Sequence, residues 1–503
     1  MSTTNPILEK LNKKTREVAM INSCASLLGW DERTYMPARG SEHRAEQLAY
    51  LAGLSHSRFV DPEIGDLLKQ LRSGTNGGGP DSDIAVTVRE IGRAYDRAVK
   101  MPQELVEEIS RTTTLAQAKW AEARKNNDFA SFKPWLEKVV NLKKQEAQAV
   151  GYEGEPYNAL LDEFEPGATV AQIEGAFAKL RDETVRLLDK LKGAARKPDP
   201  KILEREYPIA AQEAFGKEAA AAIGFDFDRG RLDITTHPFC TGIGPGDTRI
   251  TTRYDAHHFP GAFFGILHEA GHGIYDQGLP AEHFGNPLGE FISLGIHESQ
   301  SRMWENMVGR SRAFWSFFYP KAQQHFAKTL GDVSLDQFYG AINTVEPSFI
   351  RVEADEVTYN LHIMIRFELE RAFFRGDLKV DDVPQAWNTT FEKYLGIRPP
   401  DDRRGCLQDV HWSAGLIGYF PTYSLGNLYA AQFFAKADAD LGGLHAQFAK
   451  GQFLPLRDWL RKNIHQHGRR YLATDLVQRV TGKPLSSDAL MAYMGKKFGE
   501  VYG

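Results

Sequence analysis

Two histidines four residues apart, His268 and His272, are the residues of this chain best suited to chemistry. They form an H-E-x-x-H sequence in a stretch with a helical apolar period, at Phe263, Leu267, Ala270 and Ile274. On a helix both imidazoles project the same way from adjacent turns and can bind one metal ion. Glu269 lies beside them, where its carboxylate can contact a water molecule rather than the metal. The segment therefore predicts a catalytic zinc site, against the alternative of a chance match.

A zinc ion held by two histidines needs a third protein ligand and one open position for catalysis. Glu298 follows on a second predicted helix, at a distance typical of zinc peptidases with a glutamate ligand. Glu290 is the alternative ligand on distance, and Asp276 is expected to be solvated or to bond a ligand imidazole. The other histidines nearby are expected to be ordinary polar residues, namely His257, His258, His283 and His297.

The composition is that of an ordinary globular protein, with 503 residues, 42% hydrophobic and 25% charged. The formal net charge of −5 and the lack of a long basic run argue against nucleic acid or an anionic membrane as partners. No apolar run is long enough to predict a transmembrane helix, and the first residues do not resemble a signal peptide. Three widely spaced cysteines are expected to be reduced thiols. We therefore expect a cytoplasmic protein.

Helical periodicity dominates the chain and predicts an all-α fold. A long helix is predicted from about residue 349 to residue 374, after Pro347. Turn-forming residues interrupt the pattern at 73–83 and 192–200, but neither stretch is long enough for an interdomain linker. Residues 1–503 are therefore expected to form a single continuous domain.

One region departs from the helical pattern. Residues 231–236 and 248–254 are rich in Thr, Ile and Arg and flank a glycine-rich stretch, which predicts a β-hairpin directly before the H-E-x-x-H helix. Such a hairpin could pair with an extended peptide at the rim of a site, or it could be purely structural.

Five motifs occur along the chain in a fixed order: D-x-R-x-T at 247–251, H-E-x-x-H at 268–272, H-E-S-Q at 297–300, I-R-x-x-A-D at 350–355 and G-x-x-Q-D-x-H-W at 405–412. Together they resemble the thermostable metallocarboxypeptidases, a zinc carboxypeptidase family of the gluzincin type. Flanking segments near residues 30–37, 157–167 and 464–469 extend the resemblance over essentially the whole chain.

The resemblance implies a metal-dependent carboxypeptidase that releases C-terminal amino acids from peptides with a free C-terminus. His268, His272 and Glu298 would bind zinc, which cobalt can replace, and Glu269 would act as the general base. Two helical lobes would surround a deep substrate groove, with the metal at its floor and the small hairpin at its rim. A homodimer is also implied.

Asp247, Arg249 and Thr251 would share one face of a strand, since strand side chains alternate. The aspartate would orient the arginine. The pair could contact the substrate or could be a structural ion pair, and we slightly favour the structural role.

An exopeptidase must distinguish a chain end from a chain middle, and arginine can bind a free α-carboxylate through two parallel hydrogen bonds. Arg351 is the candidate for this clamp. On the predicted long helix, Asp355 and Tyr359 would follow it on the same face, so an intrahelical ion pair with Asp355 is the alternative.

His411 and Tyr423 lie in polar sequence near the last motif and are candidate donors to a developing oxyanion. They could instead be packing residues. Two other functions remain open: an oligopeptidase or dipeptidyl carboxypeptidase on the same scaffold, and a non-enzymatic protein stabilised by zinc. Glu269 argues against the latter, because a structural zinc site fills all four positions and needs no base.

Overall fold

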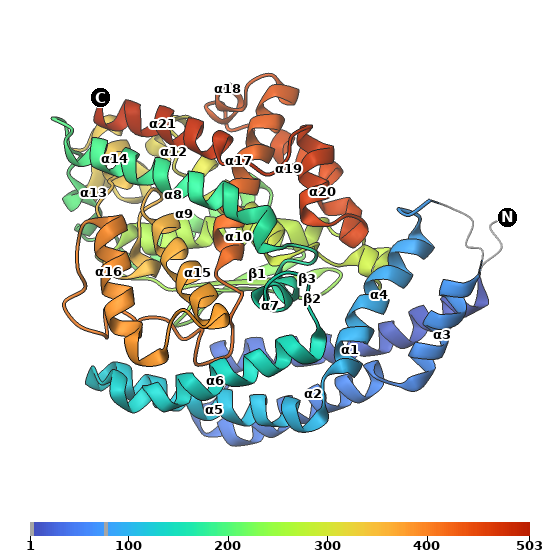
Figure 1. Ribbon diagram of the computed structural model, residues 1–503. Coiled ribbons are helices and arrows are strands. Elements are labelled where there is room, and N and C mark those ends of the chain that lie inside the picture. The colour runs from blue at the N-terminus through green and yellow to red at the C-terminus, as the bar shows by residue number, and fades with distance from the viewer. Residues whose placement is uncertain (1–4, 75–78) are drawn as a thin grey trace.

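Helices make up most of the computed structural model, which describes residues 5–74 and 79–503 (Figure 1). Residues 1–4, part of the segment judged not to resemble a signal peptide, and 75–78, part of the predicted break at 73–83, lie outside this description. The all-α prediction is confirmed, with one small sheet. No helix among the described residues is long and apolar enough to cross a membrane.

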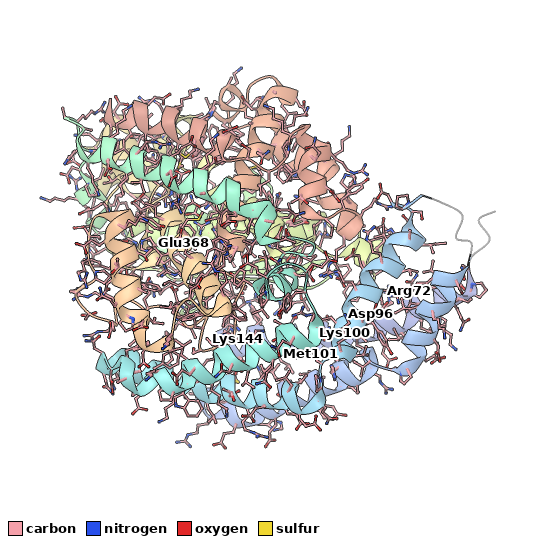
Figure 2. The ribbon with its side chains drawn as sticks, viewed as in Figure 1. Arg72, Asp96, Lys100, Met101, Lys144 and Glu368 are labelled. Carbon is pink, nitrogen blue, oxygen red and sulfur yellow. The ribbon has the colours of Figure 1, made fainter. Side chains whose placement is uncertain are left out.

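The N-terminal helices form an elongated layer along one side of the molecule, blue to cyan in Figure 1. They are α1 (Pro6–Thr34), α2 (Ser41–Phe59), α3 (Pro62–Ser73), α4 (Asp83–Lys100), α5 (Gln103–Asn126) and α6 (Phe129–Val150). In α3, Asp61 caps the first turn, and Ile64, Leu67, Leu68 and Leu71 then bury one face against α1 and α4. An ion pair of 2.9 Å between Arg72 and Asp96 joins α3 to α4 on the outside (Figure 2).

The remaining helices build the main body around one large hydrophobic core. They are α7 (Tyr157–Phe164), α8 (Val170–Lys192), α9 (Ile209–Ile223), α10 (Phe259–Gly278), α11 (Leu294–Arg302), α12 (Arg312–His325), α13 (Ala327–Leu330), α14 (Leu335–Ile342), α15 (Tyr359–Arg375), α16 (Val383–Leu395), α17 (Pro421–Leu441), α18 (Leu444–Phe448), α19 (Leu454–Asn463), α20 (Ala473–Thr481) and α21 (Asp488–Tyr502).

Glycines allow α10, α11 and α17 to pack closely. A Cβ on Gly271 of α10 would lie 2.7 Å from the backbone oxygen of Gln300 in α11, and one on Gly426 of α17 would lie 2.6 Å from the Cγ of Glu298. Any larger residue at these positions would push the helices apart. The close packing brings the H-E-x-x-H helix against the helix that carries Glu298.

The small sheet contains β1 (Gly230–Ile234), β2 (Cys240–Gly244) and β3 (Asp247–Thr252), in the order β1-β3-β2. The predicted hairpin is wrong. Its two segments do pair, with Arg231 opposite Arg249, but they run parallel. The glycine-rich stretch between them is itself a strand, β2, which pairs antiparallel with β3 after a tight turn at Gly246, whose φ is +86°.

The long helix predicted from 349 to 374 is also wrong at its start. Residues Arg351–Glu353 form a single 3₁₀ turn, and α15 begins only at Tyr359. The cause is Asp355, whose carboxylate accepts hydrogen bonds from the backbone N–H groups of Val357 and Thr358. A side chain that bonds the backbone locally competes with a continuous helix. Arg351 and Asp355 therefore share no helix face, and Arg351 pairs with another residue.

Candidate functional site

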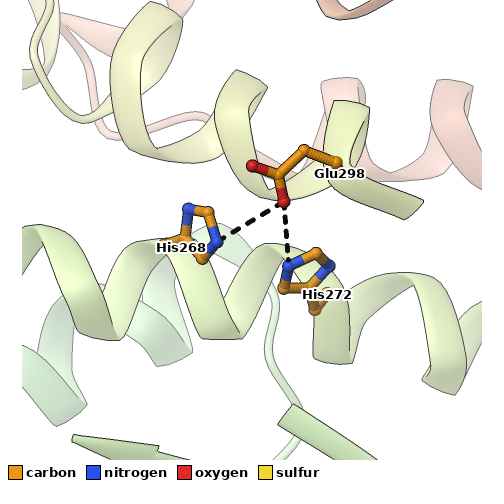
Figure 3. Close-up of side chains that lie close together, drawn as sticks. All are labelled: His268, His272 and Glu298. Carbon is orange, nitrogen blue, oxygen red and sulfur yellow. Dashed lines mark ion pairs between the residues drawn. The ribbon is translucent and has the colours of Figure 1, made fainter. Parts of the chain in front are cut away.

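Helices α10 and α11 bring His268, His272 and Glu298 together, as the spacing predicts (Figure 3). The Nε2 atoms of the two histidines lie 3.7 and 3.4 Å from Oε2 of Glu298, and the three candidate ligand atoms lie within 4.8 Å of one another. Two imidazoles and a carboxylate are donors suited to a divalent transition metal. The alternative ligand Glu290 instead pairs with Arg469 at 3.1 Å.

Each histidine of the triad is oriented through its other ring nitrogen. Nδ1 of His268 lies 2.9 Å from Oε2 of Glu305, and Nδ1 of His272 lies 2.5 Å from Nδ1 of His297. The Nε2 atoms are left to face Glu298. His297 in turn contacts Asp276 at 3.0 Å, so Asp276 reaches the His272 imidazole through His297 rather than directly. Such outer partners fix the ring orientation of metal-binding histidines.

Glu298 is held in place as an ionised carboxylate. Its Oε1 accepts from Nε of Arg302 at 2.7 Å, and its Oε2 accepts from Oγ of Ser301 at 3.1 Å. Burial alone would raise the pKa of Glu298, but the charges on Arg302 and His268 hold it well below its usual range. The donor set and its oriented partners therefore fit a divalent cation.

Glu269 is buried beside the triad, with 7% of its surface exposed. Burial raises its pKa to about 7; the carboxylates of Glu298 and Glu305 add to this effect, and His268 opposes it. A carboxyl group that titrates near neutral pH is suited to general acid–base chemistry.

Arg351 pairs with Asp409 of the G-x-x-Q-D-x-H-W motif, not with Asp355. Its Nε and Nη2 donate to Oδ1 of Asp409 at 3.0 and 2.9 Å, and its Nη1 donates to the hydroxyl of Tyr359 at 3.2 Å. Gln408 accepts from the backbone N–H of Arg351 at 2.9 Å. The G-x-x-Q-D-x-H-W motif thus holds the arginine of the I-R-x-x-A-D motif. This arginine is 6% exposed.

His411 and Tyr423 lie next to this arginine. Nε2 of His411 is 3.4 Å from the hydroxyl of Tyr423, whose ring lies 5.1 Å from the Arg351 guanidinium. Burial lowers the pKa of His411 to about 4, although Asp409 opposes the shift, and burial raises that of Tyr423 well above its usual value. Both side chains are therefore neutral near pH 7 and can donate a hydrogen bond.

Asp247 and Arg249 bind each other on β3. Nε and Nη2 of Arg249 donate to the two carboxylate oxygens of Asp247 at 2.9 and 2.8 Å, and its guanidinium lies 4.2 Å from the centre of the Trp30 ring in α1. Thr251 bonds the backbone of Phe239. These contacts favour the structural interpretation of the pair.

Sequence reasoning missed three residues around the triad, Arg302, Glu305 and His297. The expectation that His297 is an ordinary polar residue is wrong, because it contacts His272. Arg302 had a usable signal, because it lies four residues after Glu298 on the same helix. Glu305 did not, because it sits in a π-helical turn, Met303–Val308, where the ordinary helical spacing no longer predicts direction.

The model of the carboxypeptidase Taq (M32) metallopeptidase family matches residues 10–498. The chain is 49% identical to thermostable carboxypeptidase 1 of Thermus thermophilus and 38% identical to carboxypeptidase 1 of Bacillus subtilis, over 97% of each chain in both cases. The crystal structure of an M32 carboxypeptidase from Deinococcus radiodurans superposes with a TM-score of 0.96 at 41% identity, covering 99% of this chain and 100% of that one.

Proposed function

Because the chain belongs to the carboxypeptidase Taq (M32) metallopeptidase family and is a metal-dependent carboxypeptidase acting on peptides, we propose residue roles for its reaction. The observation that carries the proposal is the convergence of His268, His272 and Glu298 beside the buried Glu269. In this proposal the enzyme releases C-terminal residues one at a time.

The three converging residues would hold the metal. Two imidazoles and one carboxylate favour zinc, and cobalt, which accepts the same donors, would replace it. When bound, the ion would polarise the scissile carbonyl and lower the pKa of water far below its ordinary value, toward roughly 7.

Glu269 is the general base in this proposal. Its carboxylate takes a proton from water as the water oxygen bonds to the scissile carbonyl carbon, and then gives that proton to the leaving amine nitrogen. The pKa of about 7 supports both steps, because the group can accept and return a proton near neutral pH.

Arg351 is the proposed clamp for the C-terminal carboxylate. Asp409 accepts from its Nε and Nη2, and Tyr359 accepts from its Nη1. Each Nη nitrogen carries one more N–H, which can donate a hydrogen bond to an incoming carboxylate. The two contacts hold the guanidinium in one orientation, which reduces the entropy lost on binding.

His411 and Tyr423 are the proposed donors to the oxyanion that develops on the scissile carbonyl. Their neutral state and their position beside Arg351 support this role. Asp247 and Arg249 are proposed to brace the sheet against α1. A cytoplasmic location and a homodimer stay predictions.

The proposal is tested by digesting a peptide and its C-terminally amidated twin, followed by mass spectrometry over time. We expect a ladder of one-residue losses from the free acid alone, abolished by a chelator and restored by zinc or cobalt. Internal or two-residue cuts in both peptides would contradict it and would favour an oligopeptidase.

A further inference from the structure

Two arginines share the single carboxylate of Asp409. Arg351 binds Oδ1 through Nε and Nη2, as described above. From α15, Arg366 donates from Nε to Oδ2 at 2.7 Å, and its Nη2 lies 2.6 Å from the same oxygen. The charges of the two guanidiniums hold the pKa of Asp409 far below its usual range, against the effect of burial, so its carboxylate is ionised. One negative charge thus faces two positive charges.

The neighbouring groups do not supply a second full negative charge. Burial lowers the pKa values of His411 and His362, so both rings are neutral near pH 7. Glu370, one turn after Arg366, accepts hydrogen bonds from Tyr157, Trp412 and the backbone of Gly418, and burial raises its pKa to about 7. Among the described residues, the buried cluster of Arg351, Arg366 and Asp409 therefore carries an excess of positive charge.

Arg366 cannot itself reach a substrate. Its side chain is 0% exposed, and its guanidinium lies 4.6 Å from the Trp387 ring and 5.5 Å from the Phe420 ring. Arg351, with 7% of its side chain exposed, is the arginine nearer to solvent. Arg366 can therefore act on a bound peptide only without contact, through its hold on Asp409 and Arg351 and through its charge.

We propose that Arg366 is a positioning residue for recognition of the substrate's C-terminal carboxylate. It fixes Asp409, which fixes Arg351, and it keeps the cluster positive. Without it, Arg351 and Asp409 would form a neutral pair, whose attraction and repulsion on an incoming carboxylate largely cancel. With Arg366 present, the carboxylate of the peptide joins that of Asp409, so that two negative charges balance the two arginines. The inference rests on the proposed clamp role of Arg351.

The test measures KM and kcat of the metal-loaded enzyme on an N-blocked peptide with a free C-terminus. Arg366→Gln should raise KM about tenfold, equivalent to about 1.4 kcal/mol, while kcat changes by less than about threefold. Arg366→Lys, which keeps the charge, should show a smaller rise. The double variant Arg366→Gln with Asp409→Asn restores one net positive charge and should bind the peptide better than Arg366→Gln alone.

A matched control is Arg371→Gln on the same helix. Arg371 pairs with Glu155 and Glu174, away from Asp409, and its loss should leave KM unchanged. Thermal unfolding of every variant shows whether it is folded. If Arg366→Gln does not fold, Arg366→Lys decides: KM within about threefold of the wild type supports the charge role, and a tenfold rise contradicts it.

A folded Arg366→Gln variant with unchanged KM overturns the inference. The inference is also overturned if Arg366→Gln lowers kcat and raises KM, and if adding Asp409→Asn relieves neither change. A merely structural residue would give that pattern. Arg351→Gln separates the two levels. If Arg351→Gln leaves KM for the free acid unchanged, the proposed clamp role of Arg351 is wrong. If Arg351→Gln raises KM and Arg366→Gln does not, only the proposed role of Arg366 is wrong.

Discussion

The guanidinium of Arg302 lies 4.1 Å from the centre of the Tyr359 ring. Arg302 also donates to Glu298 at 2.7 Å, and the hydroxyl of Tyr359 accepts from Arg351 at 3.2 Å. One chain of contacts therefore joins a proposed metal ligand to the proposed carboxylate clamp. In an exopeptidase the spacing between these two points determines which peptide bond is cut, so a rigid connection between them has a direct chemical purpose.

Tyr359→Phe removes the hydroxyl that accepts from Arg351 but keeps the ring beneath Arg302. We expect KM for free-acid peptides to rise roughly tenfold, because a hydrogen bond to a charged group contributes about 1.5–3 kcal/mol. Metal content should not change, since the contact between Arg302 and Glu298 remains. Steady-state kinetics and metal analysis of the same preparation check both points, and a loss of metal would show that the hydroxyl also supports the metal site.

Glu305→Gln weakens the contact that orients His268. We expect affinity for zinc to fall by about 10–100-fold, as for other outer partners of metal-binding histidines. Competition with a chromogenic chelator measures the change without using activity. Glu290→Gln is the control, because Glu290 pairs with Arg469 outside the triad; equal losses in the two variants would argue against a specific role for Glu305.

Glu165 gives a pH dependence of stability. It is fully buried and accepts hydrogen bonds from Ser293, Tyr429 and the backbone of Gly295, and burial raises its pKa to about 7. Since the folded pKa lies above the ordinary value of 4.5, the folded state binds the proton more tightly. Its contribution to stability is therefore fully present below about pH 4.5 and is lost as the pH rises through about 7.

The comparison of wild type with Glu165→Gln isolates this group. As the pH rises from about 5 to about 8, the free energy of unfolding of the wild type should fall relative to that of the variant by up to about 3 kcal/mol. Urea unfolding at several pH values measures the difference. Parallel pH profiles for the two proteins would contradict the raised pKa.

The helical fold and the convergence of His268 with His272 could be predicted because both depend on local spacing. Residues four apart on a helix share a face wherever the helix packs, so His268 and His272 converge as expected. The triad also needed Glu298 on a second helix, and the order of motifs supplied it. Where the chemistry is local to one helix or repeated in a motif, the sequence is sufficient.

The failures have two causes: contacts between distant segments, and a side chain that competes locally with a helix. The pairing of β1 with β3 is parallel because β2 crosses to the far edge of β3, which no local pattern reveals. The start of α15 was misplaced because Asp355 bonds the backbone N–H groups of Val357 and Thr358. The partner of Arg351 proved to be Asp409, 58 residues away, rather than the aspartate one helical turn ahead.

The central claim is that Glu269 acts on the reaction and not on the metal. Glu269→Gln keeps the size and shape of the side chain but cannot accept a proton. We expect the purified variant to retain a full equivalent of metal, measured by elemental analysis, while kcat falls by roughly 10²–10⁴-fold. A metal-loaded variant that cleaves peptides at nearly the wild-type rate would contradict the account.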